Sequence, residues 1–493
     1  MLQYLTLYSL TAVLVLTSSV LALLLSWLWL RHSTLFLKRK SLPPGGMGWP
    51  IIGQSLEFLA SRPSLASQPF IERHSARCRH RRYGDIFKCH LFGNPFIIST
   101  NAKINDYILR NEDVLFQSCQ PTRAHTWVLG EKTLTDIHTD MHMKIRDALT
   151  DLLSSDKSKG EIFDLLQNMM STKLGSWQDQ FVHVQHEATS FVLSLLLKCL
   201  LGHSVEDLEL EDLQALYNES KNLLAFPLNI PGSGYRRHAE CHRRLITVLR
   251  KRIDEWRTSK LETYPDFLEI LWNEEQNGNL KDNSNLALDC LMGILFHGEE
   301  TTAMAMTLII KFLSESPRAL DQIKEEHAAI YKRKGKAKSL TWEDYESMEF
   351  TKNVIKESLR LGNVVPWVCR VALQDVEIKG FIIPKGWKVL VFLMGPHIDG
   401  TCYHDPKSFN PWRWKAIGND SNFIPYGAGL RCCPGEKAAN MLLTIFLHLF
   451  ITKYSWQVVG EDDMICFPVM TFQEGFPVVV KDVKDADECL ILH

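Results

Sequence analysis

One segment determines how the whole 493-residue sequence is interpreted: Phe423-Ile-Pro-Tyr-Gly427-Ala-Gly429-Leu-Arg431-Cys-Cys433-Pro-Gly435. Its glycines permit the close backbone approach that a flat cofactor requires. A helical pattern follows directly, from Glu436 to about Ile451, and the dipole and free N–H groups at its start favour a thiolate over a thiol. The planar guanidinium of Arg431 could meet a carboxylate of the cofactor. These are the requirements of a haem iron bound by cysteine.

The same segment resembles the haem-binding loop of the cytochrome P-450 superfamily, Phe-x-x-Gly-x-Arg-x-Cys-x-Gly. Cys433 lies two residues after Arg431 and two before Gly435, so the resemblance makes Cys433, and not Cys432, the axial ligand of the iron. It also implies haem b as the cofactor, with Gly427 and Gly435 in the cofactor-binding loop. Tyr426 departs from the family, which usually has Phe there, and its phenol group needs a hydrogen-bond partner.

A second pattern is Glu357-Ser-Leu-Arg360, within a helix expected from about Glu343 to Leu361. Residues three apart share one face of a helix, so this carboxylate and guanidinium can form an ion pair. Taken alone, the spacing favours a solvent-exposed pair. Its position ahead of Cys433 is similar to the Glu-x-x-Arg of the family, which implies a buried structural triad completed by Arg413.

A third pattern, His297-Gly-Glu-Glu-Thr-Thr302, lies inside a long apolar helix expected from Asp289 to Leu313. Glycine in mid-helix costs about 1 kcal/mol relative to alanine, and Thr301 can bond to a carbonyl one turn earlier. One interpretation is a helix kink with a buried hydroxyl group. The other rests on similarity to the Ala-Gly-x-Asp/Glu-Thr of the family, which implies that Glu300 and Thr301 relay protons to bound dioxygen. His297 stands where the family usually has a small apolar residue.

The resemblance also implies contacts to the haem propionates. Arg370 and His397 match propionate-binding positions of the family, and Arg431 is the third. A basic cluster over residues 138–146 supplies further candidates, and these are His142, Lys144 and Arg146. A solvated basic face explains that cluster equally well.

The rest of the pattern is mainly helical. Leu-rich helical spacing covers residues 185–200 and 207–225, and residues 240–257 have the pattern of a charged amphipathic helix. Short strands separated by Gly or Pro are expected at 376–378, 381–383 and 389–392. The sequence therefore predicts a mainly α fold with small β-sheets. The resemblance implies the cytochrome P-450 fold, with haem between the long central helix and the Cys loop.

The amino terminus predicts attachment to a membrane. Residues 1–30 carry no charged side chain, and about 20 residues at about 1.5 Å each span a hydrocarbon core. Basic residues follow from Arg31, and the positive-inside rule keeps them in the cytosol. A cleaved signal peptide is the alternative, but it requires positive charge before the apolar run. We expect a single-pass anchor at 1–30, a basic Pro/Gly-rich stalk at 31–50, and a cytosolic haem-thiolate monooxygenase domain at 51–493 on the endoplasmic reticulum membrane.

Composition excludes several classes of protein. Hydrophobic residues make up 45% and charged residues 23%, which is typical of a globular chain and not of a disordered or collagen-like one. With 55 Lys and Arg against 57 Asp and Glu, the chain lacks the basic excess of a nucleic-acid-binding protein. The 12 cysteines form no CxxC pair, and a cytosolic domain keeps its thiols reduced, so a disulfide framework is not expected.

Several stretches resemble the plant steroid and terpenoid branch of the family, above all the brassinosteroid side-chain hydroxylases that act at C-22 or C-23. These stretches include residues 42–53, 225–232 and 409–414. The resemblance implies hydroxylation of an apolar steroid, such as a phytosterol or brassinosteroid precursor, with O2 and electrons from NADPH. A GxGxxG after a strand is absent from the sequence, so we expect a separate NADPH-cytochrome P-450 reductase as partner. The apolar run Leu223–Pro231 either dips into the membrane or forms an ordinary buried loop.

Three alternatives stay open at the level of sequence. A diterpenoid or triterpenoid oxidase of plant specialised metabolism would share many of these stretches. A haem-thiolate isomerase would need no external electrons, although Glu300 and Thr301 argue against it. A non-enzymatic haem sensor would use His297 as a second ligand of the iron.

Overall fold

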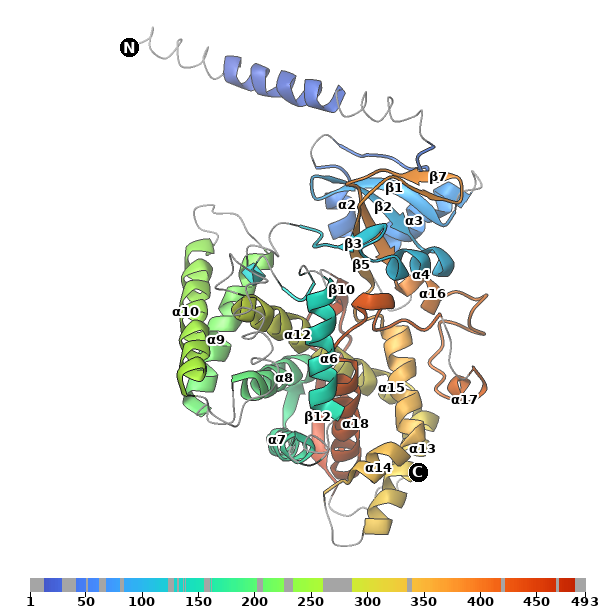
Figure 1. Cartoon of the computed structure of the whole chain (residues 1–493). Coiled ribbons are helices and arrows are strands. Elements are labelled where there is room, and N and C mark those ends of the chain that lie inside the picture. Colours follow the sequence, from blue (N-terminus) through green and yellow to red (C-terminus); the bar gives the residue numbers. More distant parts are fainter. Residues whose placement is uncertain are drawn as a thin grey trace. The chain divides into compact units, whose positions relative to one another are not determined.

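The computed structural model divides the chain into two units, the first formed by residues 1–62, 67–117 and 368–392 and the second by residues 63–66, 118–367 and 393–493 (Figure 1). The structure describes residues 13–28, 41–49, 52–61, 68–79, 84–122, 128–130, 133–135, 137, 139–154, 160, 162–201, 207–225, 234–259, 286–334, 339–417, 422–466 and 470–483.

The first unit is built on a five-stranded sheet with the strand order β1-β2-β8-β5-β3. Its strands are β1 (Ile86–Leu91), β2 (Asn94–Ser99), β3 (Phe116–Ser118), β5 (Trp367–Ala372) and β8 (Lys388–Phe392). β1 and β2 form an antiparallel hairpin in which Leu91 faces Asn94. The two connecting residues, Phe92 and Gly93, both have positive φ, as the tight turns that join such hairpins require.

Helices and a second hairpin complete the first unit. They are α2 (Ser55–Ala60), α3 (Pro69–Arg79), α4 (Ala102–Arg110), β6 (Val376–Ile378) and β7 (Phe381–Ile383). Asn101 caps α4, because its side chain accepts from the backbone N–H groups of Lys103 and Ile104. The strands predicted at 376–378, 381–383 and 389–392 are confirmed, and β5 is a further strand that the sequence analysis did not delimit.

The second unit is a helical body around one long, mostly buried helix, α12 (Leu286–Ser314). The other helices are α6 (Thr139–Ser154), α7 (Phe163–Gly175), α8 (Val184–Leu201), α9 (Asp207–Ala225), α10 (Tyr235–Ser259), α13 (Pro317–Lys334), α14 (Trp342–Ser347), α15 (Glu349–Gly362), α16 (Met394–His397), α17 (Arg413–Ile417) and α18 (Glu436–Lys453). Small sheets of β4 (Phe181–His183), β12 (Pro477–Asp482) and β9 (Tyr454–Val458), and of β10 (Met464–Cys466) and β11 (Met470–Phe472), complete it. The predicted mainly α fold with small sheets is confirmed.

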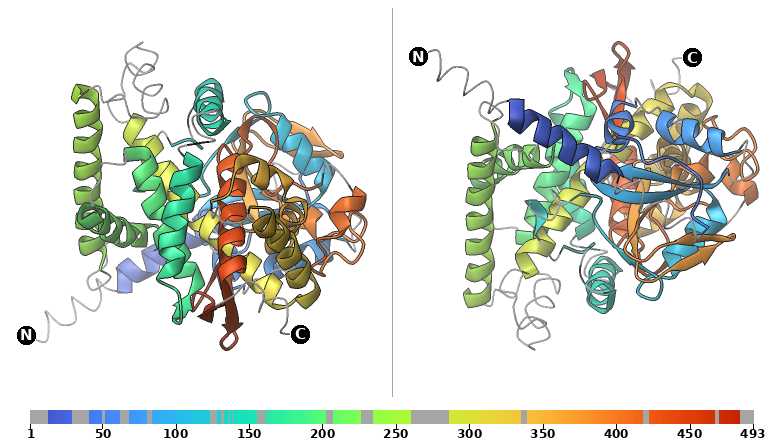
Figure 2. Two further views of the ribbon diagram at one scale, coloured as in Figure 1. Left: turned by 90° about the horizontal axis from the view of Figure 1, so that it is seen from below. Right: turned by 90° about the horizontal axis from the view of Figure 1, so that it is seen from above.

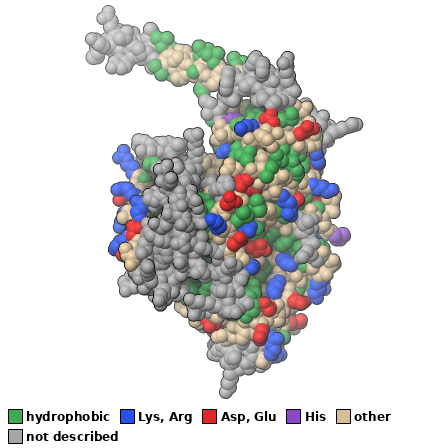
Figure 3. Space-filling model, viewed as in Figure 1, with side chains coloured by type: hydrophobic (Ala, Val, Ile, Leu, Met, Phe, Trp, Pro, Cys, Tyr) green, Lys and Arg blue, Asp and Glu red, His purple; other side chains and the backbone are tan. Residues whose placement is uncertain are grey.

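Helix α12 forms the centre of this unit because α8, α15 and α18 all pack against it. α9 and α10 lie side by side on the flank of the unit (Figure 2). The exposed face of α10 carries Arg236, Arg237, Arg243, Arg244 and Arg250, and basic side chains line that edge in Figure 3. The helices predicted at 185–200, 207–225, 240–257 and 289–313 are confirmed.

The prediction of a single helix from Glu343 to Leu361 is wrong. Met348 has non-helical backbone angles and separates α14 from α15. Thr341 and Asp344 form a capping box at the start of α14. α15 begins anew because the Glu326 carboxylate, on α13, accepts from the backbone N–H groups at its start, 2.8 Å from Phe350 and 2.9 Å from Thr351.

The amino-terminal prediction is covered only in part. Residues 13–28 form an apolar helix, Val13–Leu28, whose side chains are mostly exposed. Among the described residues, only α8 passes a length-and-composition test for crossing a membrane, and 56% of it is buried, as in the core helix of a soluble domain. Residues 1–12 and 29–30 of the anchor, 31–40 and 50 of the stalk, and 226–231 of the apolar run lie outside the described residues. The anchor and the domain boundaries therefore stay predictions.

Candidate active site

The Cys loop folds back on itself ahead of α18. The backbone N–H of Cys433 donates to the carbonyl oxygen of Tyr426 at 2.9 Å. Between them, Gly427 and Gly429 have φ of 77° and 74°, values at which a side chain would be strained. A Cβ placed on Gly427 would meet no atom within 4 Å. The backbone at this point is therefore open to the close approach of a planar group.

The Cys433 sulfur has the surroundings of a metal ligand. Cys433 as a whole residue is exposed, but the protein around its sulfur raises the pKa of the thiol to about 11 by burial. The backbone N–H groups of Gly435 and Glu436, at the start of α18, bond to the sulfur and lower that pKa. A thiol with this pKa is protonated at neutral pH, whereas a metal ion deprotonates a coordinating thiol outright. The sulfur and its two N–H donors fit the thiolate ligand of a haem iron.

Cys432 has a different environment. Its side chain is half-buried, and its sulfur lies 3.8 Å from Nη1 of Arg146, on α6. The same nitrogen donates to the carbonyl oxygen of Leu430 at 3.3 Å. Of the three basic candidates on α6, Arg146 thus contacts the Cys loop, while Lys144 is exposed and His142 is buried.

Arg431 is fixed to the segment that leads into α6. Its Nη2 donates to the carbonyl oxygen of Ile137 at 2.6 Å and to Oγ1 of Thr139 at 2.9 Å. Its Nη1 donates to the carbonyl oxygen of Leu134 at 3.3 Å. These contacts hold the guanidinium two residues from Cys433, and its predicted contact with a propionate stays a prediction.

His397 and Arg370 have internal partners. The His397 ring is 1% exposed, with Nδ1 2.8 Å from Oδ1 of Asn363 and Nε2 accepting from the N–H of Ile424 at 3.1 Å. Both ring nitrogens therefore make contacts inside the protein, and the ring positions the segment at the start of the Cys loop through Ile424. Arg370 belongs to the first unit, where its Nε lies 2.8 Å from the buried carboxylate of Glu112.

Tyr426 has the partner that its phenol group requires. Its hydroxyl donates to Oδ1 of Asn440, on α18, at 3.0 Å. Burial, followed by the negative charges of Cys433 and Glu436, raises the pKa of this phenol, so it stays protonated. The departure from Phe at this position is accommodated by one hydrogen bond.

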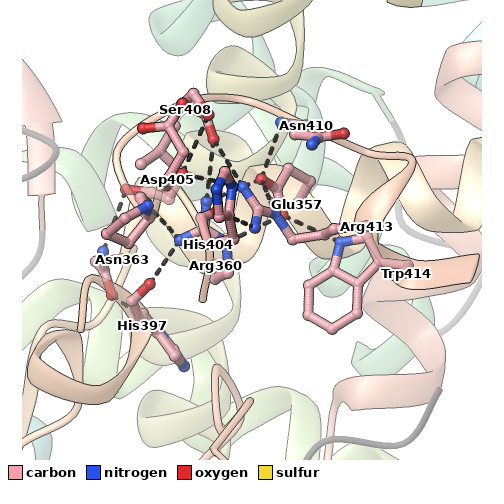
Figure 4. Close-up of polar contacts among 12 residues, drawn as sticks. Glu357, Arg360, Asn363, His397, His404, Asp405, Ser408, Asn410, Arg413 and Trp414 are labelled. Carbon is pink, nitrogen blue, oxygen red and sulfur yellow. Dashed lines mark hydrogen bonds and ion pairs between the residues drawn. The ribbon is translucent and has the colours of Figure 1, made fainter. Parts of the chain in front are cut away.

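The structure brings Glu357, Arg360 and Arg413 together in the buried network of Figure 4. The Glu357 carboxylate lies 2.8 Å from Nη2 of Arg360 and 3.0 Å from Nε of Arg413. Trp414 Nε1 and the backbone N–H of Asn410 also donate to it, at 3.1 and 2.9 Å. Glu357 and Arg360 are fully buried, so the alternative of an exposed surface pair is excluded.

The two arginines of this network bind the chain that leads toward the Cys loop. Arg360 donates to the carbonyl oxygens of His397 and Pro406, at 2.5 and 2.7 Å. Arg413 donates to those of His404 and Asp405, at 2.8 and 3.1 Å. The network is therefore structural: it fixes residues 397–414 onto α15.

The polar turn of α12 is helical throughout. Thr301 Oγ1 donates to the carbonyl oxygen of His297 at 2.6 Å, one turn earlier, as the sequence suggested. His297 is exposed, and its Nδ1 lies 2.7 Å from the carbonyl oxygen of Gly293. Helix α12 continues without a break from Leu286 to Ser314, so these backbone-directed bonds do not interrupt it.

Sequence analysis missed the partner of Glu300. Lys221, on α9, lies 3.2 Å from Oε1 of Glu300 and 2.8 Å from Oε1 of Glu299. Glu299 is fully buried, whereas Glu300 is 28% exposed. Burial raises the pKa of Glu299 to about 7, although Lys221 lowers it. The sequence did show acidic residues, Glu299 among them, as unusual in an apolar helix. Nothing near them in the sequence indicated that Lys221 would be their partner.

Comparisons with known proteins bear on this arrangement. The family model described as Cytochrome P450 matches residues 43–474, which is most of the chain. The chain belongs to the cytochrome P450 family. It therefore has the P450 fold, binds haem b, and is a monooxygenase enzyme that uses O2 and electrons from a redox partner.

Relatives and solved structures agree with this membership. An abietadienol/abietadienal oxidase of Pinus taeda is 36% identical over 89% of this P450 and 90% of its own length. A steroid (22S)-hydroxylase of Oryza sativa subsp. indica is 34% identical, with 93% and 92% covered. Retinoic acid-bound cyanobacterial CYP120A1 superposes with a TM-score of 0.78 at 22% identity, over 90% of this P450 and 100% of the other chain, and this similarity supports the fold alone.

Proposed function

We propose that this P450 hydroxylates an apolar steroid, such as the side chain of a phytosterol or brassinosteroid precursor, and that Cys433 would hold its haem iron. The observation that carries the ligand assignment is the Cys433 sulfur, which accepts hydrogen bonds from the N–H groups of Gly435 and Glu436 within a loop of the matching spacing. The steroid assignment is supported by the steroid (22S)-hydroxylase relative, which is similar over 93% of the chain.

The residues of the second unit divide the work. Bound haem supplies the activation of dioxygen and the oxidation of a C–H bond. Cys433 would hold the haem iron as its thiolate ligand. Glu300 and Thr301 hold protons on α12, and Arg431, beside Cys433, is the candidate for a haem propionate. Arg370 and His397 are the further candidates for the propionates, as the resemblance implies.

Electrons come, in this proposal, from NADPH-cytochrome P450 reductase. The sequence has no dinucleotide-binding GxGxxG after a strand, so the reductase is a separate protein. The uncharged residues 1–30 and the basic residues that follow support a single-pass anchor in the endoplasmic reticulum membrane. An apolar substrate dissolved in the same membrane would reach the enzyme there.

A second candidate function is oxidation of a diterpenoid. It is favoured by the pine abietadienol/abietadienal oxidase, whose identity of 36% is similar to that of the steroid hydroxylase. The identities do not separate the two substrates, because substrate choice depends on a small set of pocket side chains and not on the total number of matches.

The test is expression of the full chain in microsomes with a plant NADPH-cytochrome P450 reductase, with sterols and diterpenes supplied separately. We expect a steroid product heavier by one oxygen atom, formed only with NADPH, and no product from Cys433→Ser. Oxidation of a diterpene but of no sterol would establish the second candidate. Conversion of a substrate without NADPH would show an isomerase and overturn the proposal.

A further inference from the structure

Helix α12 carries two adjacent carboxyl groups that share one cation. Lys221 reaches Oε1 of both Glu299 and Glu300, at 2.8 and 3.2 Å. Glu299, the more deeply buried of the two, is not one of the residues that the family pattern selects. The single positive charge of Lys221 cannot neutralise both carboxylates where little water reaches them. The buried carboxyl group of Glu299 is therefore the one that takes up a proton more readily.

The second oxygen of Glu299 makes this site more unusual. The hydroxyl of Tyr217, on α9, faces the Glu299 carboxyl group and favours its ionised form, although both that hydroxyl and Oε2 of Glu299 are buried and neither makes a hydrogen bond of normal length and angle. Burial, followed by the charges of Glu299 and Glu300, raises the pKa of Tyr217, so its hydroxyl group stays protonated. The proton that Glu299 takes up or releases therefore does not come from Tyr217.

The neighbouring helices add no competing cation at this turn in the contacts that the structure describes. On α8, the apolar side chain of Leu196 lies against Gly298, where an added Cβ would meet it at 3.1 Å. On α10, Nδ1 of His242 lies 2.8 Å from Oγ of Ser220, the residue before Lys221. Burial lowers the pKa of His242, so this imidazole is largely neutral near pH 7. The groups that act on Glu299 are thus Lys221 and Tyr217 from α9 and Glu300 from its own helix.

We propose that Glu299 is a positioning residue: by taking up or releasing a proton, it controls whether Lys221 pairs with one carboxylate or with two. With Glu299 protonated, Lys221 is left to Glu300, which is then held as a carboxylate. With Glu299 ionised, Lys221 is drawn to it, and Glu300 is freer to accept and deliver a proton. This inference extends the proposed role of Glu300 in the monooxygenase reaction and rests on it.

The primary test does not depend on turnover. Infrared difference spectra of the substrate-free, haem-loaded full chain are recorded across a pH series, following the carbonyl stretch of protonated carboxyl groups. We expect a band that titrates near pH 7 in the wild type and is absent from Glu299→Gln. Lys221→Met removes the charge that lowers the Glu299 pKa and moves the midpoint up, whereas Glu300→Gln removes a charge that raises it and moves the midpoint down.

A matched control is Glu315→Gln, because Glu315 forms an exposed pair with Lys311 near the end of the same helix. This variant should leave the midpoint unchanged. A titrating band that persists in Glu299→Gln, or a midpoint unmoved by both Lys221→Met and Glu300→Gln, would overturn the proposal. The infrared test uses no substrate. If no steroid is oxidised, it can still confirm or contradict the titration of Glu299.

The second readout is the pH profile of product formed per NADPH with whichever substrate is accepted. We expect kcat of Glu299→Gln to be several-fold lower with KM unchanged, and its profile to lose the inflection near pH 7. A purely structural role would lower activity equally at every pH and keep the inflection, and that outcome would contradict the proposed coupling.

Discussion

Tyr426 donates a hydrogen bond from its phenol group to Asn440 Oδ1 at 3.0 Å, and this bond joins the Cys loop to α18. Removing either partner should have unequal costs. Tyr426→Phe leaves a half-buried amide oxygen that water can reach, so we expect a loss of about 1 kcal/mol in the free energy of unfolding. Asn440→Ala leaves a phenol whose pKa is raised by burial without a partner and should cost about 1–3 kcal/mol. Denaturant unfolding of the haem-loaded protein measures both, and equal losses would show that the bond is not the deciding contact.

The two adjacent cysteines should differ in spectrum. Cys433→Ser should lose the thiolate signature in the reduced, carbon monoxide-bound spectrum, because its sulfur with two N–H donors is the proposed ligand. Cys432→Ser should keep that signature, since its sulfur lies beside Arg146. The reverse pattern would show that Cys432 holds the iron.

The buried network around Glu357 should be sensitive to loss of one charge. Glu357→Gln leaves Arg360 and Arg413 buried without their carboxylate, and we expect a loss of about 3–5 kcal/mol in unfolding free energy. The matched control is Lys311→Met, which removes an exposed pair with Glu315 and should cost no more than about 0.5 kcal/mol. Similar losses in both variants would contradict the structural role of the network.

Acid should destabilise the protein through the buried His327. Its Nδ1 lies 3.1 Å from Nδ1 of His448, and its Nε2 lies 3.2 Å from Thr351 Oγ1. Burial, followed by repulsion from His448, lowers the pKa of His327 well below 6.5. The unfolded chain therefore binds more protons than the native one below pH 6.5, so stability falls as the pH falls through that range.

The check on this prediction is a comparison with His327→Asn. The difference in unfolding free energy between wild type and variant should rise with pH up to about 6.5 and be level above it. A difference that is independent of pH between 5 and 8 would mean that His327 does not stay neutral in the native state.

Local patterns in the sequence were sufficient for several elements of the fold. The apolar spacing of residues 289–313 predicted α12, and the Gly- and Pro-separated runs at 376–392 predicted β6, β7 and β8. The resemblance of the interval from Arg431 to Gly435 to the family motif made Cys433, and not Cys432, the candidate ligand, and this choice stays a prediction. Such features depend on residues a few positions apart, whose relative placement follows from the backbone geometry of a helix, strand or turn.

Contacts across long stretches of chain were settled by folding alone. The pairing of Lys221 with Glu299 and Glu300 joins helices separated by more than 70 positions. Arg146 is the one of three basic residues on α6 that contacts the Cys loop, because that part of α6 lies beside Leu430. The break at Met348 likewise needed Glu326 from α13 to cap a new helix. Side-chain packing decides which distant groups meet, and the spacing of residues along a chain contains no record of it.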